Sequence, residues 1–432
     1  MAGHLETVRD AATGETKTVI HITLHDWIWF ELDPVRTETG IRANAKAVRA
    51  FIHQFPKLFE ERYRKKYEAD PERYGRHHWD RVEVRVEEFS GIKIEGVESD
   101  LLAIAGRMAP DIIYLNFRKS DTYIQQGFLY PLDRPEDGYL TAMTEEEKAW
   151  RIHEKFWPVI HRRGPGGKQV WALPHGGAIG KVLIYRKDFF DEAGVPYPDE
   201  TWTWDDLYEA CRKLADPGRG KYAIALRNTK DESWRWMDFL FAAGSQVMHY
   251  DDTADRWSIA FDNTNTVSAL EYYVKLCNEP WTDAEGRTRR GYAYRAAHYA
   301  ASAQAWKNGD IAILLGTIQE EVFAKSFDPT LVGLAPMPIG PTGIRKSALN
   351  TKMMALFAQI EEPAVRDAAW EFIRFYGSKE AAEIKTRALV EGGLGRFVNP
   401  ATLKVFGYEE LIRFAPPGWQ QTFELSVEHS EP

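Results

Sequence analysis

The sequence predicts an α/β protein made of two lobes. Its 432 residues exceed what a single hydrophobic core usually serves. Runs typical of buried strands alternate with amphipathic helical patterns over roughly the first 120 residues, an order that favours a parallel, doubly wound sheet. A second series of this kind begins after the segment 171–177, which contains proline and two glycines.

The composition narrows the class of protein. With 55 basic and 64 acidic residues the net charge is −9, so no nucleic-acid partner is expected. The longest apolar run is 353–358, far below the roughly 18 residues of a membrane-spanning helix. Cys211 and Cys277 fit neither a disulfide framework nor zinc-ligand spacing, so we expect free thiols and no metal site.

The first predicted strand ends on polar and aromatic residues. Residues 1–17 are polar and lack the pattern of a signal peptide, which is expected either of a cytoplasmic protein or of a mature form whose signal has been removed. Val19–Leu24 is rich in β-branched residues and predicts a buried strand, followed by His25, Asp26 and Trp27. Open α/β sheets bind ligands at the carboxyl ends of their strands, which makes these three residues candidates for a ligand.

The remainder of the first half continues the alternation. Apolar residues with helical spacing predict a helix at 48–59, disturbed by Pro56. Charges of both signs fill 60–80, which we interpret as a solvated helical insertion. Alternating valines at 82–86 and the apolar run 110–115 predict two further strands, the second opening into a loop at 116–121.

The second half has clear start and stop signals. Thr203 and Asp206 have the spacing that caps a helix, which should run to Leu214. The proline-stiffened 331–338 is expected to be extended and to cross between lobes. The other expected elements are strands at 182–185, 311–315 and 352–357, helices at 236–244, 267–277, 299–308 and 362–376, and a loop-rich tail after 393.

Four segments, in order along the chain, carry a family resemblance. They are 108–113 with 123–133, 185–194 with Thr203–Trp204, 305–313, and 332–338. They resemble, in order, segments of the extracellular solute-binding proteins of ABC importers, in the maltose-binding-like family 1. The family segments are "PDI, then GxLxPLD", "YNKDLFxxAG, then TW", "FxxGxAAM" and the return crossing. Arg186 and Trp306 depart from the usual Asn and Phe of these segments.

The resemblance implies two doubly wound α/β lobes of the type II periplasmic-binding-protein kind, joined by hinge crossings. We expect a first lobe at 18–173 plus 337–380, a second at 175–335 plus 385–432, and crossings near 173–175, 335–337 and 379–385. It further implies solute capture in the cleft between lobes, hinge closure, and delivery to the transmembrane subunits of an ABC permease. The protein would be a monomer without cofactor or enzymatic activity, periplasmic or lipid-anchored outside the cytoplasmic membrane. Residues 1–17 would then be the N-terminal tail of the mature protein.

The abundance of tryptophan, 15 residues, favours a sugar or oligosaccharide as the solute. Sugars present flat apolar faces and hydroxyl groups, which suit aromatic platforms beside planar polar side chains. In the second lobe, Trp234 and Trp236 are two residues apart and cannot share a helical face, so one is expected at the ligand and the other in the core. The candidate ligand-binding residues are His25, Asp26, Trp27, Asn116, Arg118, Asp231, Trp234, Gly316, Thr317, Asn350, Gly393, Arg396 and Trp419.

Two alternatives remain at this point. A phosphorylated polyol or another anion would use helix N-termini with Arg118 or Arg396, and acidic sugars would satisfy both the aromatic and the basic candidates. A carbohydrate-active hydrolase is the remote alternative, because a glycosidase normally needs two carboxylates flanking one bond and no pair in the sequence stands out.

Overall fold

A computed structural model divides the chain into two compact units, which are described one at a time. Unit 1 comprises residues 1–177 and 351–395, and unit 2 comprises 178–350 and 396–432. The structure describes residues 2–11, 13–25, 28–29, 39–89, 109–177, 180–227, 233–251, 253–254, 256–296, 299–316 and 328–431. Of 39–41, 118–119, 227, 233–234, 296, 299–300 and 329 it describes the main chain.

These boundaries correct two of the three expected crossings. The first, expected at 173–175, falls close by at 177/178. The second, expected at 335–337, lies at 350/351, because 332–336 is a strand inside the sheet of unit 2. The third, expected at 379–385, lies at 395/396, because 379–391 forms a helix of unit 1. Residues 337–350 therefore belong to unit 2 and 381–395 to unit 1.

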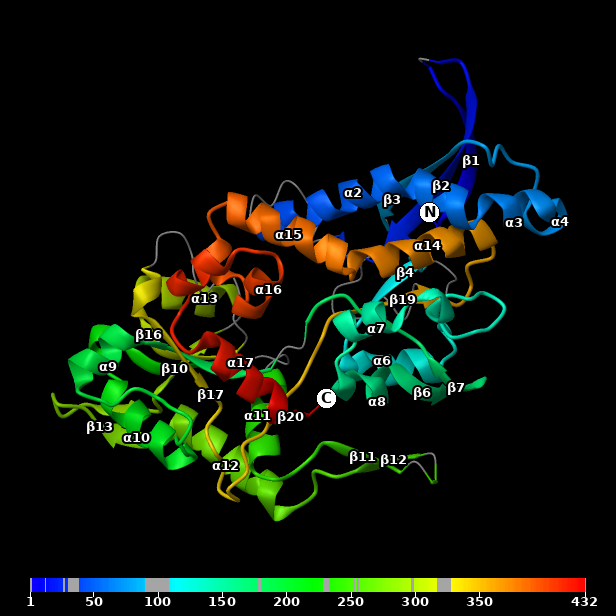
Figure 1. The fold of residues 1–432 in the computed structure, drawn as a ribbon. Coiled ribbons are helices and arrows are strands. Elements are labelled where there is room, and N and C mark those ends of the chain that lie inside the picture. The colour runs from blue at the N-terminus through cyan, green and yellow to red at the C-terminus, as the bar shows by residue number, and fades with distance from the viewer. Residues whose placement is uncertain are drawn as a thin grey trace. The chain divides into compact units, whose positions relative to one another are not determined.

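Unit 1 is a mixed sheet with helices on both faces. Figure 1 shows α2, α14 and α15 on one side of β4 and β19, and α6, α7 and α8 on the other. Its elements are β1 His4–Arg9, β2 Thr16–Leu24, α2 Thr39–Arg62, α3 Arg64–Ala69, α4 Pro71–Tyr74, β3 Val82–Glu88, β4 Ile112–Leu115, α6 Phe117–Gln125, β5 Leu129–Tyr130, α7 Glu145–Arg151, α8 Trp157–Ile160, β6 His161–Gly164, β7 Gly167–Val170, β8 Leu173–Pro174, β19 Met353–Phe357, α14 Pro363–Tyr376 and α15 Lys379–Glu391.

The strand order in unit 1 is β1-β2-β4-β19-β5, with β3 on β2 and β8 on β19. Strands β2, β3 and β4 are parallel, as expected. Strand β19 returns from the far end of the chain and lies antiparallel between β4 and β5, with Met353 opposite Leu115. The sheet is therefore mixed where the sequence predicted a parallel one, because the inserted strand comes from a segment more than 200 residues away.

The N-terminal segment is an edge strand where a tail was expected. Strand β1 pairs antiparallel with β2 from His4 to Arg9. Ahead of it, the Gly3 amide donates to the buried carboxylate of Asp111 at 3.3 Å, and the Thr23 amide and hydroxyl donate to the same carboxylate at 2.7 Å each. Burial raises the pKa of Asp111 although these hydrogen bonds favour its charged form.

The charged insertion at 60–80 is less solvated than expected. It contains α3 and α4, and its aromatic residues Tyr63, Tyr67, Tyr74 and Trp79 are buried. The Tyr67 hydroxyl donates to Asp367 of α14 at 2.5 Å. Alternation of charged and aromatic residues thus gives the insertion one face that packs on α14 and one that faces solvent.

Unit 2 repeats the architecture with its own sheet, in the order β15-β10-β16-β9-β17. Strands β10, β15 and β16 are parallel, and β9 lies antiparallel between β16 and β17. Its elements are β9 Val182–Arg186, α9 Lys187–Ala193, α10 Trp204–Leu214, β10 Tyr222–Arg227, α11 Ser233–Ala242, β11 Met248–Asp251, β12 Arg256–Ile259, α12 Thr264–Asn278, β13 Pro280–Thr282, β14 Thr288–Arg290, β15 Ala293–Ala296, α13 Tyr299–Asn308, β16 Ile311–Gly316, β17 Val332–Pro336, β18 Ser347–Ala348, α16 Pro400–Val405, α17 Trp419–Glu428 and β20 Ser430–Glu431.

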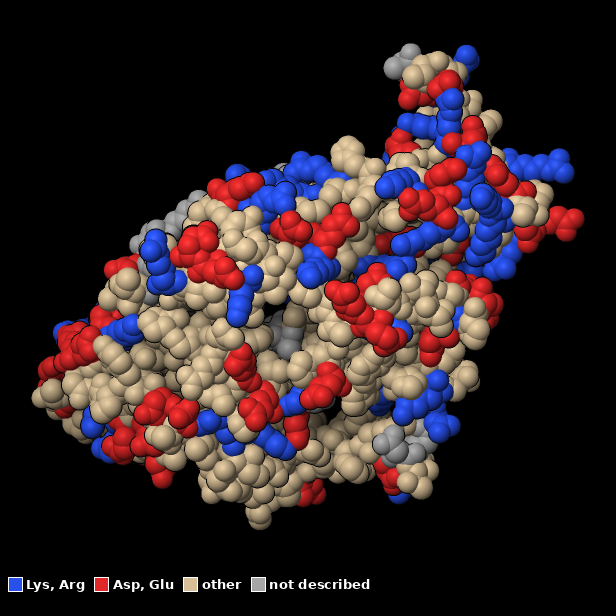
Figure 2. All heavy atoms as spheres, viewed as in Figure 1, with Lys and Arg blue, Asp and Glu red and all other residues tan. Residues whose placement is uncertain are grey.

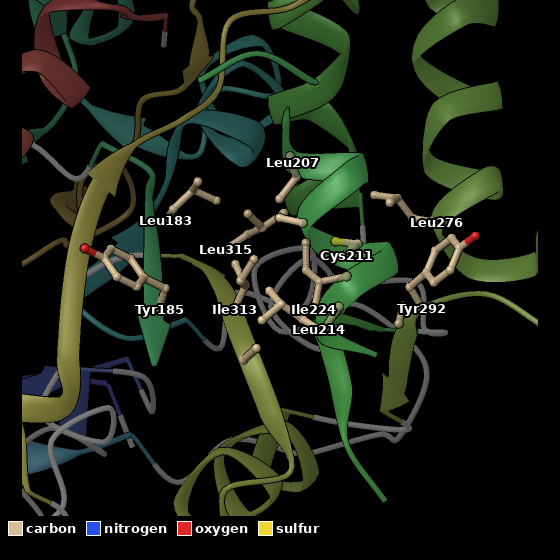
Figure 3. Packing of buried hydrophobic residues seen from close by; sticks show 14 of the residues in the cluster. Leu183, Tyr185, Leu207, Cys211, Leu214, Ile224, Leu276, Tyr292, Ile313 and Leu315 are labelled. Atoms are coloured by element: carbon tan, nitrogen blue, oxygen red, sulfur yellow. The ribbon is translucent and has the colours of Figure 1, made fainter. Parts of the chain in front are cut away.

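The core of unit 2 is built between this sheet and α10. Leu207, Cys211 and Leu214 project from α10 onto Ile224 of β10 and Ile313 of β16 (Figure 3). The predicted capping box is present, with the Thr203 hydroxyl accepting from the Asp206 amide and the Asp206 carboxylate accepting from the Thr203 amide. Two local signals, apolar spacing and the cap, therefore place this helix correctly.

Two helical predictions need correction. Helix α2 continues through Pro56, with Phe51, Phe55 and Phe59 buried along its inner face. The tail expected to be loop-rich contains α16 and α17, and α17 packs against β17. Among the described helices, none is both long and apolar enough to cross a membrane.

Candidate functional site

In unit 1, two predicted candidates follow neighbouring strands of the sheet. His25 follows β2 and Asn116 follows β4. The strands are parallel, with Leu24 at the end of β2 opposite Ile112 at the start of β4, so Asn116 lies farther along the sheet than His25 by most of the length of β4. The His25 amide donates to the Ile112 carbonyl at 3.0 Å, which holds the end of β2 against β4. Asn116 directly precedes α6, so it stands at the N-terminus of a nine-residue helix. Arg118 lies in the first turn of that helix, with its main chain described.

The segments of unit 1 that lead into the first and second crossings are held next to each other. Strand β8 pairs with β19, with Pro174 opposite Met353. Beyond it, the His175 amide donates to the Lys352 carbonyl at 3.0 Å. The hydroxyl of the buried Thr351 lies 3.2 Å from the carbonyls of Gly176 and of Gly177. The first and second crossings therefore leave unit 1 side by side.

The buried side chain of Arg151 hydrogen-bonds to the segment that leads into the first crossing. The Arg151 guanidinium donates to the Pro174 carbonyl through Nε at 2.9 Å and through a terminal nitrogen at 2.7 Å. It also donates to the Ile373 carbonyl at 3.1 Å and the Arg374 carbonyl at 3.2 Å, at the C-terminal end of α14. Burial lowers the pKa of Arg151 to about 9. A cation here satisfies carbonyls that the last turn of a helix leaves without partners.

His175 is held neutral at this position. Burial lowers the pKa of its imidazole well below the usual value, and the positive charges of Lys352, Lys385 and Arg151 act in the same direction. Its ring lies 5.4 Å from that of Tyr376, centroid to centroid. A neutral imidazole presents one donor and one acceptor, which suits a hydroxyl-rich ligand.

In unit 2, helix α11 brings three predicted candidates to one place. Arg235 of its first turn donates through Nε to the Leu315 carbonyl at 3.1 Å, beside Gly316 at the end of β16. One turn further, the buried Asp238 carboxylate accepts from the Ala348 amide at 2.9 Å. The main chain of Trp234 adjoins Arg235, and Asn350 follows Ala348 by two residues. These two hydrogen bonds therefore gather Trp234, Gly316 and Asn350 around the start of α11.

Asn350 has an unused hydrogen-bonding atom. Its Oδ1 is enclosed and has no hydrogen-bond partner among the described residues, and the same holds for Nε1 of Trp236 on α11. One is an acceptor and the other a donor.

Three other candidates have packing or turn positions. Trp419 is only 5% exposed and packs in the apolar cluster beneath β9 and β17, which gives its indole a structural role. Gly393 has φ of +78° just past the end of α15, a conformation that glycine tolerates best. Arg396 lies over the ring of Phe397 at 4.7 Å, and its Nε has no hydrogen-bond partner among the described residues.

Asp26, Trp27, Asp231 and Thr317 lie outside the described residues, and of Trp234 and Arg118 the main chain alone is described. Conversely, His175, Thr351, Arg235 and Asp238 sit at the two sheet edges and were not predicted. No local signal marks them, because they reach these edges through antiparallel pairing and helix packing across long sequence separations.

Comparison with known proteins identifies the family. Residues 88–383 match the family model described as "Bacterial extracellular solute-binding protein", and the chain belongs to this family. The resemblance seen in the sequence is confirmed, and the protein is a solute-binding protein of the kind used by ABC transporters.

Individual relatives are distant. A binding protein of Brucella abortus (strain 2308) is 24% identical over 328 residues, covering 73% of this chain and 72% of the relative. A mannitol-binding protein of Pseudomonas aeruginosa (strain PAO1) is 25% identical over 213 residues, covering 48% and 46%.

Solved structures share the fold. An ABC transporter solute-binding protein of Thermotoga lettingae with bound α-D-tagatose has a TM-score of 0.59 at 19% identity, covering 88% of this chain and 86% of that one. A substrate-binding protein of Listeria monocytogenes in complex with cycloalternan has a TM-score of 0.62 at 18% identity, covering 95% and 88%. The type II periplasmic-binding-protein fold expected from the sequence is thereby confirmed.

Proposed function

We propose that this protein captures a sugar or sugar alcohol outside the cytoplasmic membrane and delivers it to the transmembrane subunits of an ABC permease. The family membership carries the transport role. The named ligands of similar proteins, mannitol, tagatose and cycloalternan, support a polyhydroxylated solute.

The candidate residues of each unit have the chemistry that such a solute needs. In unit 1 they are His25 after β2 and Asn116 after β4, with Trp27 and Asp26 just beyond β2. In unit 2 they are Trp234, Gly316 and Asn350 around the start of α11. Tryptophan faces stack on the apolar faces of sugars, and amide, carboxylate and imidazole groups pair with hydroxyls. The proposed action is binding without bond cleavage.

A thermal-shift screen tests the solute class. Monosaccharides, oligosaccharides, sugar alcohols, uronic acids, polyol phosphates and amino acids would each be added to the purified protein. A ligand that binds only the folded state raises the midpoint in proportion to ln(1 + [L]/Kd). A shift with sugars or sugar alcohols, and recovery of the unchanged compound after long incubation, supports the proposal. A shift with polyol phosphates alone would replace it with an anion receptor, and cleavage of the sugar would refute it.

Two substitutions then test the site. Trp27→Ala and Trp234→Ala should each weaken binding by about 1 kcal/mol or more, a roughly fivefold or greater rise in Kd, through lost stacking area. Trp150→Ala on α7 is the matched control, because Trp150 is not among the proposed binding residues, and it should leave Kd unchanged. Wild-type affinity in both test variants would refute the site while leaving the family membership intact.

A further inference from the structure

Unit 1 contains a pocket that none of the candidate solute-binding residues lines. It has a volume of about 500 Å³ and lies between α7, with the residues just before it, and the junction of α14 with α15. Small-molecule sites in proteins typically have volumes of roughly 300–1,000 Å³. We call this cavity the α7–α15 pocket.

The two walls of the α7–α15 pocket are fixed to each other. The Arg374 guanidinium donates to the Glu147 carboxylate at 2.8 and 2.9 Å from a terminal nitrogen and at 3.1 Å from Nε. It also donates to the Ala142 carbonyl at 3.0 Å. Arg151, which lines the pocket as well, is held by its four hydrogen bonds to carbonyls. The pocket is therefore a preformed part of unit 1, as small-molecule sites usually are.

Part of the pocket lining is apolar. It consists of the half-buried indole of Trp150 together with Met143 and Ala149. The Lys379 ammonium group lies 5.9 Å from the centre of the Trp150 ring, so an aromatic side chain and a cation border the same space. Because an indole presents a large flat apolar face, this part of the lining suits a planar or apolar ring.

The polar part of the lining offers hydrogen-bond donors. The Ser378 hydroxyl accepts from the Ala381 amide at 3.1 Å, and its own proton has no acceptor among the described residues. The four hydrogen bonds of Arg151 use four of its five N–H groups. Lys379 is exposed in the first turn of the 13-residue helix α15, where the helix dipole disfavours a cation and favours an anion. Helix stability therefore does not explain a lysine at this position.

Two cations of the α7–α15 pocket have no carboxylate partner. Figure 2 shows acidic side chains over α7, whose first turn is acidic. Of the two carboxylates that line the pocket, that of Glu147 is paired with Arg374 and that of Glu146 is exposed. Within the described part of the chain, neither Arg151 nor Lys379 forms an ion pair. Two cations therefore stand against one exposed carboxylate, and this charge balance favours an anionic ligand.

We propose that the α7–α15 pocket binds a small ring carboxylate, with the ring on Trp150 and the carboxylate group at Lys379. A small molecule fits better than an acidic side chain of a protein partner, because the cavity is preformed and large enough to hold a whole molecule. The site is separate from the proposed solute site and does not depend on which solute is transported. Its occupant would lie beside Arg151, whose guanidinium also holds the Pro174 carbonyl ahead of the first crossing.

Fluorine NMR of para-fluorobenzoate titrated with the purified protein tests the proposal. The resonance should shift and broaden, and uncharged para-fluorobenzamide should bind about fivefold or more weakly. Lys379→Met and Trp150→Ala should each raise the Kd of para-fluorobenzoate about fivefold or more. Lys57→Met on α2 is the matched control, because the Lys57 side chain is 78% exposed and does not line the pocket, and it should leave Kd unchanged. Lys379→Met removes a cation from the first turn of a helix, so unchanged circular dichroism spectra should verify its folding.

Four results would overturn the proposal. They are an unchanged para-fluorobenzoate resonance at millimolar concentrations, an affinity that Lys379→Met leaves at the wild-type value, tighter binding of para-fluorobenzylamine, and binding of the peptide acetyl-Phe-Glu-Phe-amide in place of para-fluorobenzoate. The last result would assign the pocket to a protein partner. A saturating amount of the sugar found in the thermal-shift screen should leave para-fluorobenzoate bound, whereas displacement would place the carboxylate in the solute site. Trp150→Ala should likewise keep its affinity for sugar, so this proposal and the proposed function succeed or fail separately.

Discussion

Replacing Arg151 by methionine should destabilise unit 1 by about 3 kcal/mol. The side chain donates four hydrogen bonds to three carbonyls, those of Pro174, Ile373 and Arg374. Each buried acceptor that loses its donor costs about 1–3 kcal/mol, and the lower end applies because methionine saves the cost of burying the charge. The substitution also removes the favourable interaction between the cation and the negative C-terminal end of the α14 dipole.

Urea unfolding followed by circular dichroism measures this loss as a lower midpoint with an unchanged slope. Arg151→Lys should lose less, because one ammonium group reaches fewer carbonyls than a guanidinium. Arg212→Met is the control. Its side chain is 52% exposed and pairs with exposed Glu209, so the change should stay within about 0.5 kcal/mol. A loss below about 1 kcal/mol for Arg151→Met would show that the anchored carbonyls find water or other donors, and would refute the reasoning.

Three further predictions concern other buried groups. The folded-state pKa of His175 lies well below 6.5, so below that pH the unfolded chain binds more protons than the folded one. The unfolding free energy should therefore fall with decreasing pH, by up to about 1.4 kcal/mol per pH unit. Urea titrations at pH 5 to 7.5 should show this slope in the wild type and a flatter one in His175→Gln. Gly333→Val should cost about 1–3 kcal/mol in thermal or urea unfolding, because an added Cβ would lie 2.1 Å from the Tyr185 ring, and an unchanged midpoint would contradict this contact. Burial raises the pKa of Cys211, so a thiol reagent should modify it only after unfolding, whereas partly exposed Cys277 should react faster in the native protein; equal rates would argue against the assigned burial.

Local signals predicted much of unit 2 and part of unit 1. The apolar runs at 19–24 and 311–315 are buried strands, and the Thr203 cap begins a helix where the spacing required. These predictions succeed because strand burial, helical periodicity and capping depend on residues within a few positions of each other. The ordered family motifs added the fold class, which the family match confirms.

Predictions failed where a segment's role depends on distant partners. Val332–Pro336 is extended, as its prolines suggested, but it is a sheet strand because it pairs with β9. The segment 379–385 was expected to cross between lobes and instead lies within α15, Lys379–Glu391, which packs along α2. Pro56 is accommodated within α2, whose inner face is buried by three phenylalanines. Burial against another element outweighs the local preference in each case.

The candidate site divides in the same way. The sequence by itself determined the strand ends that carry His25, Asn116 and Gly316, because an apolar run that stops at polar residues is a local feature. Only the tertiary structure decided that Thr351 and His175 lie at the sheet edge of unit 1. It also decided that Arg235 and Asp238 hold the candidates of unit 2 near α11, and that Trp419 packs in the apolar core. The physical reason is that hydrogen bonds and packing across 80 or more residues leave no periodicity or spacing in the sequence from which they could be read.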